Sequence, residues 1–93
     1  MSVLTYTVNM QEFQNRIDIV ERSRYQLSNW VARRDMGKLL DNCETLLKKL
    51  SQESVNCRRF HKETLRYKEL AAELDTLLSH CEQHLTFAAL LSS

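Results

Sequence analysis

MGKLLDNCETLLKKL, the stretch at residues 36–50, carries apolar side chains at alternating steps of three and four residues. The same steps continue to residue 88 without a change of phase. This pattern is typical of a helix that packs a coiled-coil-like seam against a neighbouring helix. The sixteen seam positions, of which only Glu53 and Thr64 are not apolar, are Met36, Leu39, Cys43, Leu46, Leu50, Glu53, Cys57, Phe60, Thr64, Tyr67, Ala71, Leu74, Leu78, Cys81, Leu85 and Ala88.

The rest of the composition also favours helices. The 93 residues contain one glycine and no proline, whereas sheet proteins need many turns that use both residues. A chain of this length forms one domain. We therefore predict an all-α fold, either an antiparallel helical hairpin or a three-helix bundle, with a long coiled-coil-like C-terminal helix.

A first helix is predicted over residues 10–34. Asn9 is a good N-cap, and Glu12 stands where a capping box needs it. Val8 and Phe13 occupy the two positions of a hydrophobic staple. Residues 1–8 are then a short extended arm or a frayed end, and residues 9–93 form the helical domain. The apolar stripe, which Arg24 interrupts, consists of Phe13, Ile17, Val20, Leu27 and Val31.

Two further boundaries follow from breaks in the pattern. The first stripe ends near residues 33–37, where Asp35 offers an N-cap and Gly37 lowers the cost of a bend. We therefore predict a turn there and a second helix over 36–50. Polar residues cluster at 51–56 (SQESVN), which favours a break and a third helix over 54–91. Because the phase does not change across 51–56, one continuous helix is the alternative.

These lengths suggest a binding surface. A wholly helical segment from 53 to 91 measures about 58 Å, and the first helix measures about 37 Å. The long helix therefore extends beyond the part that the first helix can cover. A partner protein is expected to cover the apolar overhang. The residues predicted to bind it are Tyr67, Leu70, Leu74, Leu77, Leu78, Leu85, Phe87, Leu90 and Leu91.

Metal and catalytic sites are not expected. Cys57 and His61, like His80 and His84, have the i,i+4 spacing of metal ligands, but on one helix the two pairs lie more than roughly 30 Å apart. Cys57 also fits the seam as a small apolar residue. Neither a glycine-rich loop nor a nucleophile motif is present. We predict no metal, no cofactor and no enzymatic activity.

A basic face is the main alternative surface. Its residues, interleaved with Phe60, His61 and Tyr67, are Arg58, Arg59, Lys62, Arg66 and Lys68. Such a face binds nucleic acid in some proteins. The net charge of +1 and the pairing of Arg59 with Glu63 and of Glu63 with Arg66 favour a solvated face instead, with Phe60 and Tyr67 in the core.

The cellular setting follows from the cysteines and the hydropathy. Cys43, Cys57 and Cys81 are odd in number and widely spaced, and no signal peptide precedes them. The longest uncharged stretch, residues 83–93, is shorter than the ~20 residues of a membrane span. We expect free thiols in a reducing, cytoplasmic compartment, and no membrane span.

Over residues 10–50 the layout resembles small export chaperones of flagellar and type III secretion systems. The resemblance rests on a first helix, the Arg34-Asp35 step and the leucine-rich LLDNCETLLKKL at 39–50. It implies a groove that binds the amphipathic helix of a substrate. The expected function is thus a non-enzymatic interaction module that oligomerises or joins a hetero-complex through its C-terminal helix. The alternatives are a helix-shielding chaperone or adaptor, and a regulator that contacts nucleic acid.

Overall fold

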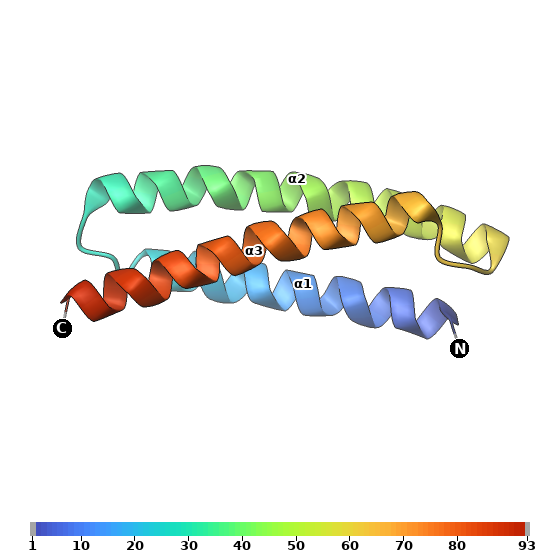
Figure 1. Ribbon diagram of the computed structural model, residues 1–93, viewed down its shortest axis with the longest axis horizontal. Coiled ribbons are helices and arrows are strands. Elements are labelled where there is room, and N and C mark those ends of the chain that lie inside the picture. Colours follow the sequence, from blue (N-terminus) through green and yellow to red (C-terminus); the bar gives the residue numbers. More distant parts are fainter. Residues whose placement is uncertain (1, 93) are drawn as a thin grey trace.

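The computed structural model describes the backbone of residues 2–92 and the side chains of residues 10–87. Over residues 2–92 the chain forms three helices, α1 (Ser2–Arg24), α2 (Trp30–Phe60) and α3 (Leu65–Ser92). They pack side by side, each antiparallel to the next, into a bundle with extents of 49 × 20 × 16 Å (Figure 1). The predicted all-α class is confirmed, in its three-helix form.

The core lies along the common axis of the three helices. It contains most of the predicted seam, and the first stripe contributes its first three positions. Burial of these side chains is the main driving force that holds the helices together. The buried apolar residues are Phe13, Ile17, Val20, Met36, Leu40, Cys43, Leu46, Leu50, Cys57, Tyr67, Leu70, Leu74, Leu78 and Cys81.

Helix α1 begins much earlier than predicted. It starts at Ser2, so the prediction of an extended arm over residues 1–8 is wrong, and Asn9 lies inside the helix and does not cap it. The β-branched residues near the N-terminus lower helix propensity only slightly. Because extending an existing helix costs less than nucleating one, the helix continues through them.

The turn between α1 and α2 covers residues 25–29, and the prediction of a turn at 33–37 is wrong. Asn29 caps α2, since its side-chain oxygen accepts a hydrogen bond from the Val31 N–H at 2.9 Å. The backbone N–H of Leu27 donates to the Arg24 carbonyl at 3.1 Å, which closes the end of α1. Asp35 lies exposed within α2 and caps nothing.

Gly37 has a different role from the one predicted. It is buried inside α2, and the guanidinium of Arg24 lies directly over it, where a Cβ atom would stand. Arg24 had appeared as a polar interruption of the first apolar stripe. Gly37 and Arg24 are therefore explained together. Gly37 has no side chain, and this makes room for the long side chain of Arg24 from the neighbouring helix.

Helix α2 runs unbroken through residues 51–56, so the predicted break there is wrong. The alternative of one continuous helix is wrong as well, because α2 ends at Phe60 and α3 begins at Leu65. The buried hydroxyl of Ser54 donates to the Ser51 carbonyl at 2.6 Å, and its polarity is therefore satisfied within the helix. A cluster of small polar residues thus stays helical. The chain turns later, at residues 61–64.

A compact hydrogen-bond network closes the turn between α2 and α3. His61 adopts the left-handed conformation with φ 56°, and the Lys62 N–H donates to the Cys57 carbonyl at 3.0 Å. Thr64 caps α3, because its hydroxyl oxygen accepts from the Tyr67 N–H at 3.1 Å. The same hydroxyl donates to a Glu53 carboxylate oxygen at 2.7 Å.

Glu53 and Thr64 are the two polar exceptions in the seam, and they bind each other. The hydrogen bond from Thr64, followed by one from Asn56, lowers the pKa of the Glu53 carboxyl. Thr64 stands seven residues after Cys57 and three before Tyr67, so the turn preserves the heptad count. A pattern that keeps its phase through a turn cannot show where the turn is.

The later turn also changes the relative helix lengths. Helix α3 has 28 residues and lies along α2, which has 31. At 1.5 Å per residue these helices measure about 42 and 46 Å. The prediction that a longer C-terminal helix overhangs its neighbours is wrong, because α2 covers α3 along most of its length.

Candidate functional site

Four of the residues predicted to bind a partner lie in the core of this chain. These are Tyr67, Leu70, Leu74 and Leu78, each at most 6% exposed. They pack against α1 and α2 and are not accessible on the surface of the bundle. Their role in this fold is therefore to hold α3 in place.

The other predicted residues divide into two groups. Leu77 and Leu85 are partly buried against the core, while Phe87 is 64% exposed. Leu90 and Leu91 lie outside the residues whose side chains the structure describes. On the described surface of α3, Leu77, Leu85 and Phe87 are thus the members of the predicted set that keep accessible surface.

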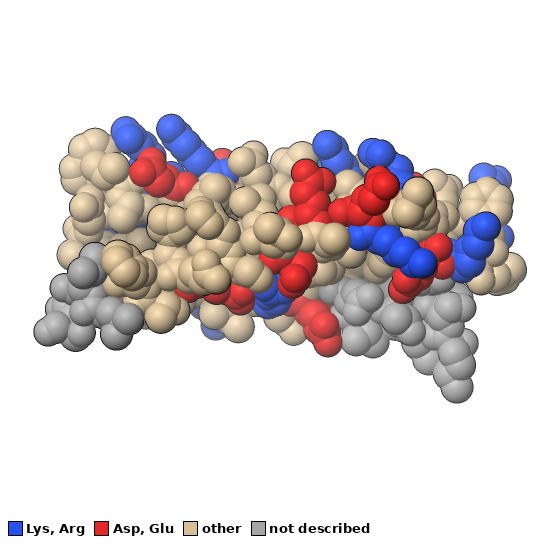
Figure 2. Space-filling view, viewed as in Figure 1, with Lys and Arg blue, Asp and Glu red and all other residues tan. Residues whose placement is uncertain are grey.

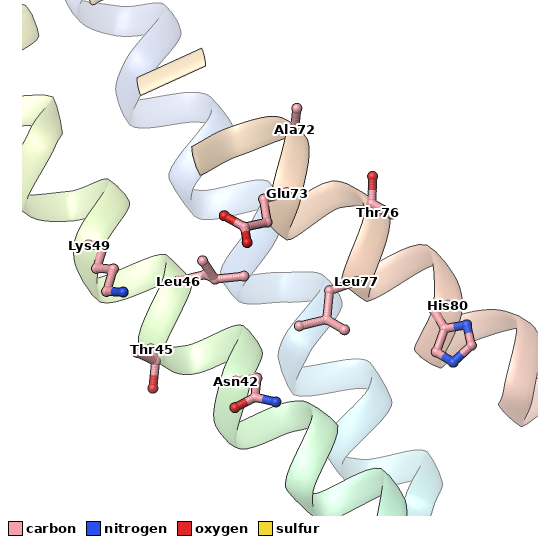
Figure 3. A pocket seen from close by; sticks show the side chains of 9 residues that line it. All are labelled: Asn42, Thr45, Leu46, Lys49, Ala72, Glu73, Thr76, Leu77 and His80. Carbon is pink, nitrogen blue, oxygen red and sulfur yellow. The ribbon is translucent and has the colours of Figure 1, made fainter. Parts of the chain in front are cut away.

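A groove of about 730 Å³ runs between α2 and α3. Leu46 of α2 and Leu77 of α3 point into the space between the two helices, whereas Ala72 and Thr76 point away from α2 (Figure 3). The lining residues of the groove are Asn42, Thr45, Leu46, Lys49, Ala72, Glu73, Thr76, Leu77 and His80.

A second depression of about 330 Å³ continues this groove toward the turn at 25–29. Leu39 is three residues from Asn42, and His84 is four from His80, so the two linings adjoin along both helices. The lining residues are Leu27, Asn29, Val31, Ala32, Asp35, Met36, Leu39, His84 and Phe87. We name the groove and this depression together the α2–α3 face.

The α2–α3 face is poor in charge. Between residues 76 and 87 the sole Lys, Arg, Asp or Glu of α3 is Glu82, and its carboxylate is bound by Arg16 of α1 at 2.7 Å. Arg16 also pairs with Asp75 at 2.6 Å. The hydrogen bond to Glu82 contributes most to a raised pKa of Arg16. This network therefore holds the Asp75 and Glu82 carboxylates of α3 against α1.

The result is a continuous uncharged band over α2 and α3 in the half of the molecule near the turn at 25–29 (Figure 2). Charges stand at its ends, with Asp35 at one and Lys49 and Glu73 at the other. Sequence reasoning identified Leu77 and Phe87 but missed Leu39, Asn42 and the two histidines. The presence of a single charged residue, Glu82, across residues 76–87 was the sequence signal that pointed to this face.

The histidine and cysteine pairs considered as metal ligands lie in different surroundings. The rings of His80 and His84 meet edge to face with centroids 4.6 Å apart on the exposed side of α3. Cys57 is fully buried and contacts Thr64, whose N–H lies 3.5 Å from its sulfur. Among the described residues no group of three or more His, Cys, Asp or Glu side chains gathers at one point.

Cys43 and Cys81 are also fully buried, one on α2 and one on α3. The neighbouring Cys81 thiol, together with burial, raises the pKa of the Cys43 thiol, whereas the Cys43 thiol lowers the pKa of Cys81. A thiolate is the reactive form of cysteine, so Cys43 is poorly suited to act as a nucleophile.

The basic residues surround the turn at 61–64, and all five are exposed. The prediction that Phe60 lies in the core is wrong, since it is 58% exposed. Phe60 is the last residue of α2, where α3 has not yet begun and offers no surface to cover it. Tyr67, in the first turn of α3, is buried as predicted.

Comparisons of the chain with known protein families, with characterised proteins and with solved structures find no match. None of the helices described over residues 2–92 carries an apolar stretch that would cross a lipid bilayer.

Proposed function

We propose that this chain is a non-enzymatic protein–protein interaction module that self-associates through the α2–α3 face. The main support for this proposal is that an open groove, an exposed Phe87 and a band without formal charge occur on the same face. Exposed apolar surface rimmed by polar residues is typical of protein interfaces. Three buried free thiols further support a reducing compartment such as the cytoplasm.

The absence of charge favours a second copy of the chain as the occupant. In a symmetric dimer the same patch faces itself, so each residue near the two-fold axis meets its own equivalent. Charged residues there would oppose like charges, which is unfavourable. A face from Leu39 and Asn42 to His80 and Phe87 that carries no formal charge avoids this repulsion.

The shape of the face supports the same partner. Leu46 and Leu77 line its floor, and Phe87 stands at its edge with most of its ring in solvent. In interfaces a few large anchors that fill a partner's pocket supply most of the binding free energy. In a symmetric pair the exposed Phe87 ring of each chain fills the depression of the other, and both rings become buried.

Light scattering over a dilution series tests this proposal. The mean mass is expected to rise with concentration from the chain mass of 11.0 kDa toward twice that value. A mass of one chain at every concentration would contradict self-association. In that case a helix from another protein, as in a chaperone or adaptor, would be the candidate occupant of the groove.

A further inference from the structure

The end of the molecule opposite the 25–29 turn concentrates positive charge. Residues 58–68 contain five Lys or Arg and one Glu, whereas the whole chain has a net charge of only +1. The remainder is therefore net negative, with a charge of −3. We name this end, around the turn at 61–64, the basic tip; its cations are Arg58, Arg59, Lys62, Arg66 and Lys68.

The cations of the basic tip have no ion-pair partner within 4 Å among the described side chains. The predicted pairing of Arg59 with Glu63 needs both residues on one helix, one turn apart. Helix α2 ends at Phe60, and the left-handed His61 turns the chain away before Glu63. Glu63 therefore does not neutralise Arg59, and the positive charge of the tip faces solvent.

Two large apolar side chains are exposed within this ring of cations. Phe60 is 58% exposed and Leu65 is 72% exposed. Together with Lys62, Glu63 and Thr64 they line a shallow depression of about 350 Å³ on the turn. The turn lies at the far end of the bundle, at the right of Figure 1, and Figure 2 shows Lys and Arg side chains there, with some Asp and Glu side chains beside them.

We propose that the basic tip binds peripherally to the surface of an anionic lipid bilayer. Phe60 and Leu65 enter the interfacial layer, while the five cations lie among the headgroup phosphates. Interfacial anchors combine apolar side chains with Lys and Arg in this way, and long basic side chains reach past the apolar layer to the headgroups. Near an anionic leaflet each Lys or Arg strengthens binding by roughly fivefold.

The same charges would attract nucleic acid, but the apolar residues favour the bilayer. Binding to single strands relies on aromatic rings that stack on bases along a positively charged groove. Leu65, the more exposed of the two residues, has no ring to stack. The cations also cluster around a single turn and do not follow a track along the bundle. A bilayer surface engages Phe60, Leu65 and the five cations at the same time.

Flotation with lipid vesicles tests this proposal. The full chain is expected to bind phosphatidylcholine vesicles that contain phosphatidylserine, and added salt should weaken the binding. Arg58→Gln with Lys62→Gln is expected to weaken it by roughly 25-fold, because two cations are lost. Phe60→Ser with Leu65→Ser is expected to weaken it by roughly tenfold or more, because two apolar anchors are lost.

Matched variants separate the tip from general effects. Lys38→Gln with Lys48→Gln removes the same charge from exposed positions in the middle of α2 and should change binding by less than about twofold. Ile19→Ser removes an exposed apolar residue of α1 and should leave binding unchanged. Circular dichroism should show that every variant stays helical, because all these side chains are exposed.

Four results would overturn the proposal. The first two are equal binding to vesicles of phosphatidylcholine alone and no binding to either kind of vesicle. The third is an equal loss of binding in the tip variants and the control variants. The fourth is binding to a single-stranded oligonucleotide without binding to anionic vesicles. None of them depends on whether the chain self-associates, because the α2–α3 face and the basic tip share no residue.

Discussion

Leu74→Ala is expected to lower the free energy of unfolding by about 3 kcal/mol, because it removes a fully buried side chain and leaves a cavity. Leu74 has no exposed surface and lies in the core where α3 packs on the other two helices. Small domains have only about 5–15 kcal/mol of stability in total, so the variant should unfold at a much lower denaturant concentration. Denaturant unfolding followed by circular dichroism measures the change.

Leu65→Ala is the matched control for this prediction. It makes the same substitution on the same helix at a position that is 72% exposed, and should change stability by less than about 0.5 kcal/mol. If Leu74→Ala cost no more than Leu65→Ala, Leu74 would lie on the surface of the single chain. It would then belong to an intermolecular interface, as the sequence pattern had indicated.

The second large effect is expected on association. His80→Glu with Phe87→Glu should weaken self-association by more than about 100-fold, because it removes an aromatic anchor and places carboxylates opposite their own copies. Both side chains are exposed, so the fold of the single chain should survive. Sedimentation equilibrium of the variant beside the unmodified chain gives the ratio of dissociation constants.

The matched control is Ile19→Glu with Val55→Glu, at positions 55% and 56% exposed on α1 and α2. It adds the same two charges to apolar sites outside the α2–α3 face and should leave the dissociation constant nearly unchanged. Equal losses in both double variants would mean that added charge alone disperses the chains. The proposed face would then have no special role.

The seam was predictable from sequence, and the turns were not. Burial depends on spacing along a helix, so the steps of three and four residues identified Cys43, Leu50 and Leu78 correctly. Helix ends depend on local hydrogen bonds that several sequences satisfy equally well. Asn9 and Asp35 have the chemistry of caps, but the chain uses Asn29 and Thr64.

The error at the α2–α3 turn carried over into the predicted binding surface. A helix assumed to begin at 54 overhung the first helix, and its seam residues seemed to lack a neighbour. With the turn at 61–64, α2 supplies that neighbour and covers Leu74 and Leu78. Leu77 and Phe87 stay accessible on α3, and the position of α2 beside α3 separates them from the core residues of the predicted set.

Position-specific NMR over a dilution series tests the central claim most directly. If the α2–α3 face joins two copies, the amide signals of Leu39, Asn42, Leu77, His80 and Phe87 should shift with concentration. Those of Ile19 and Val55, which lie on other surfaces, should stay in place. Signals that do not move at any concentration, or that move around Ile19 and Val55 and not along the groove, would contradict the account.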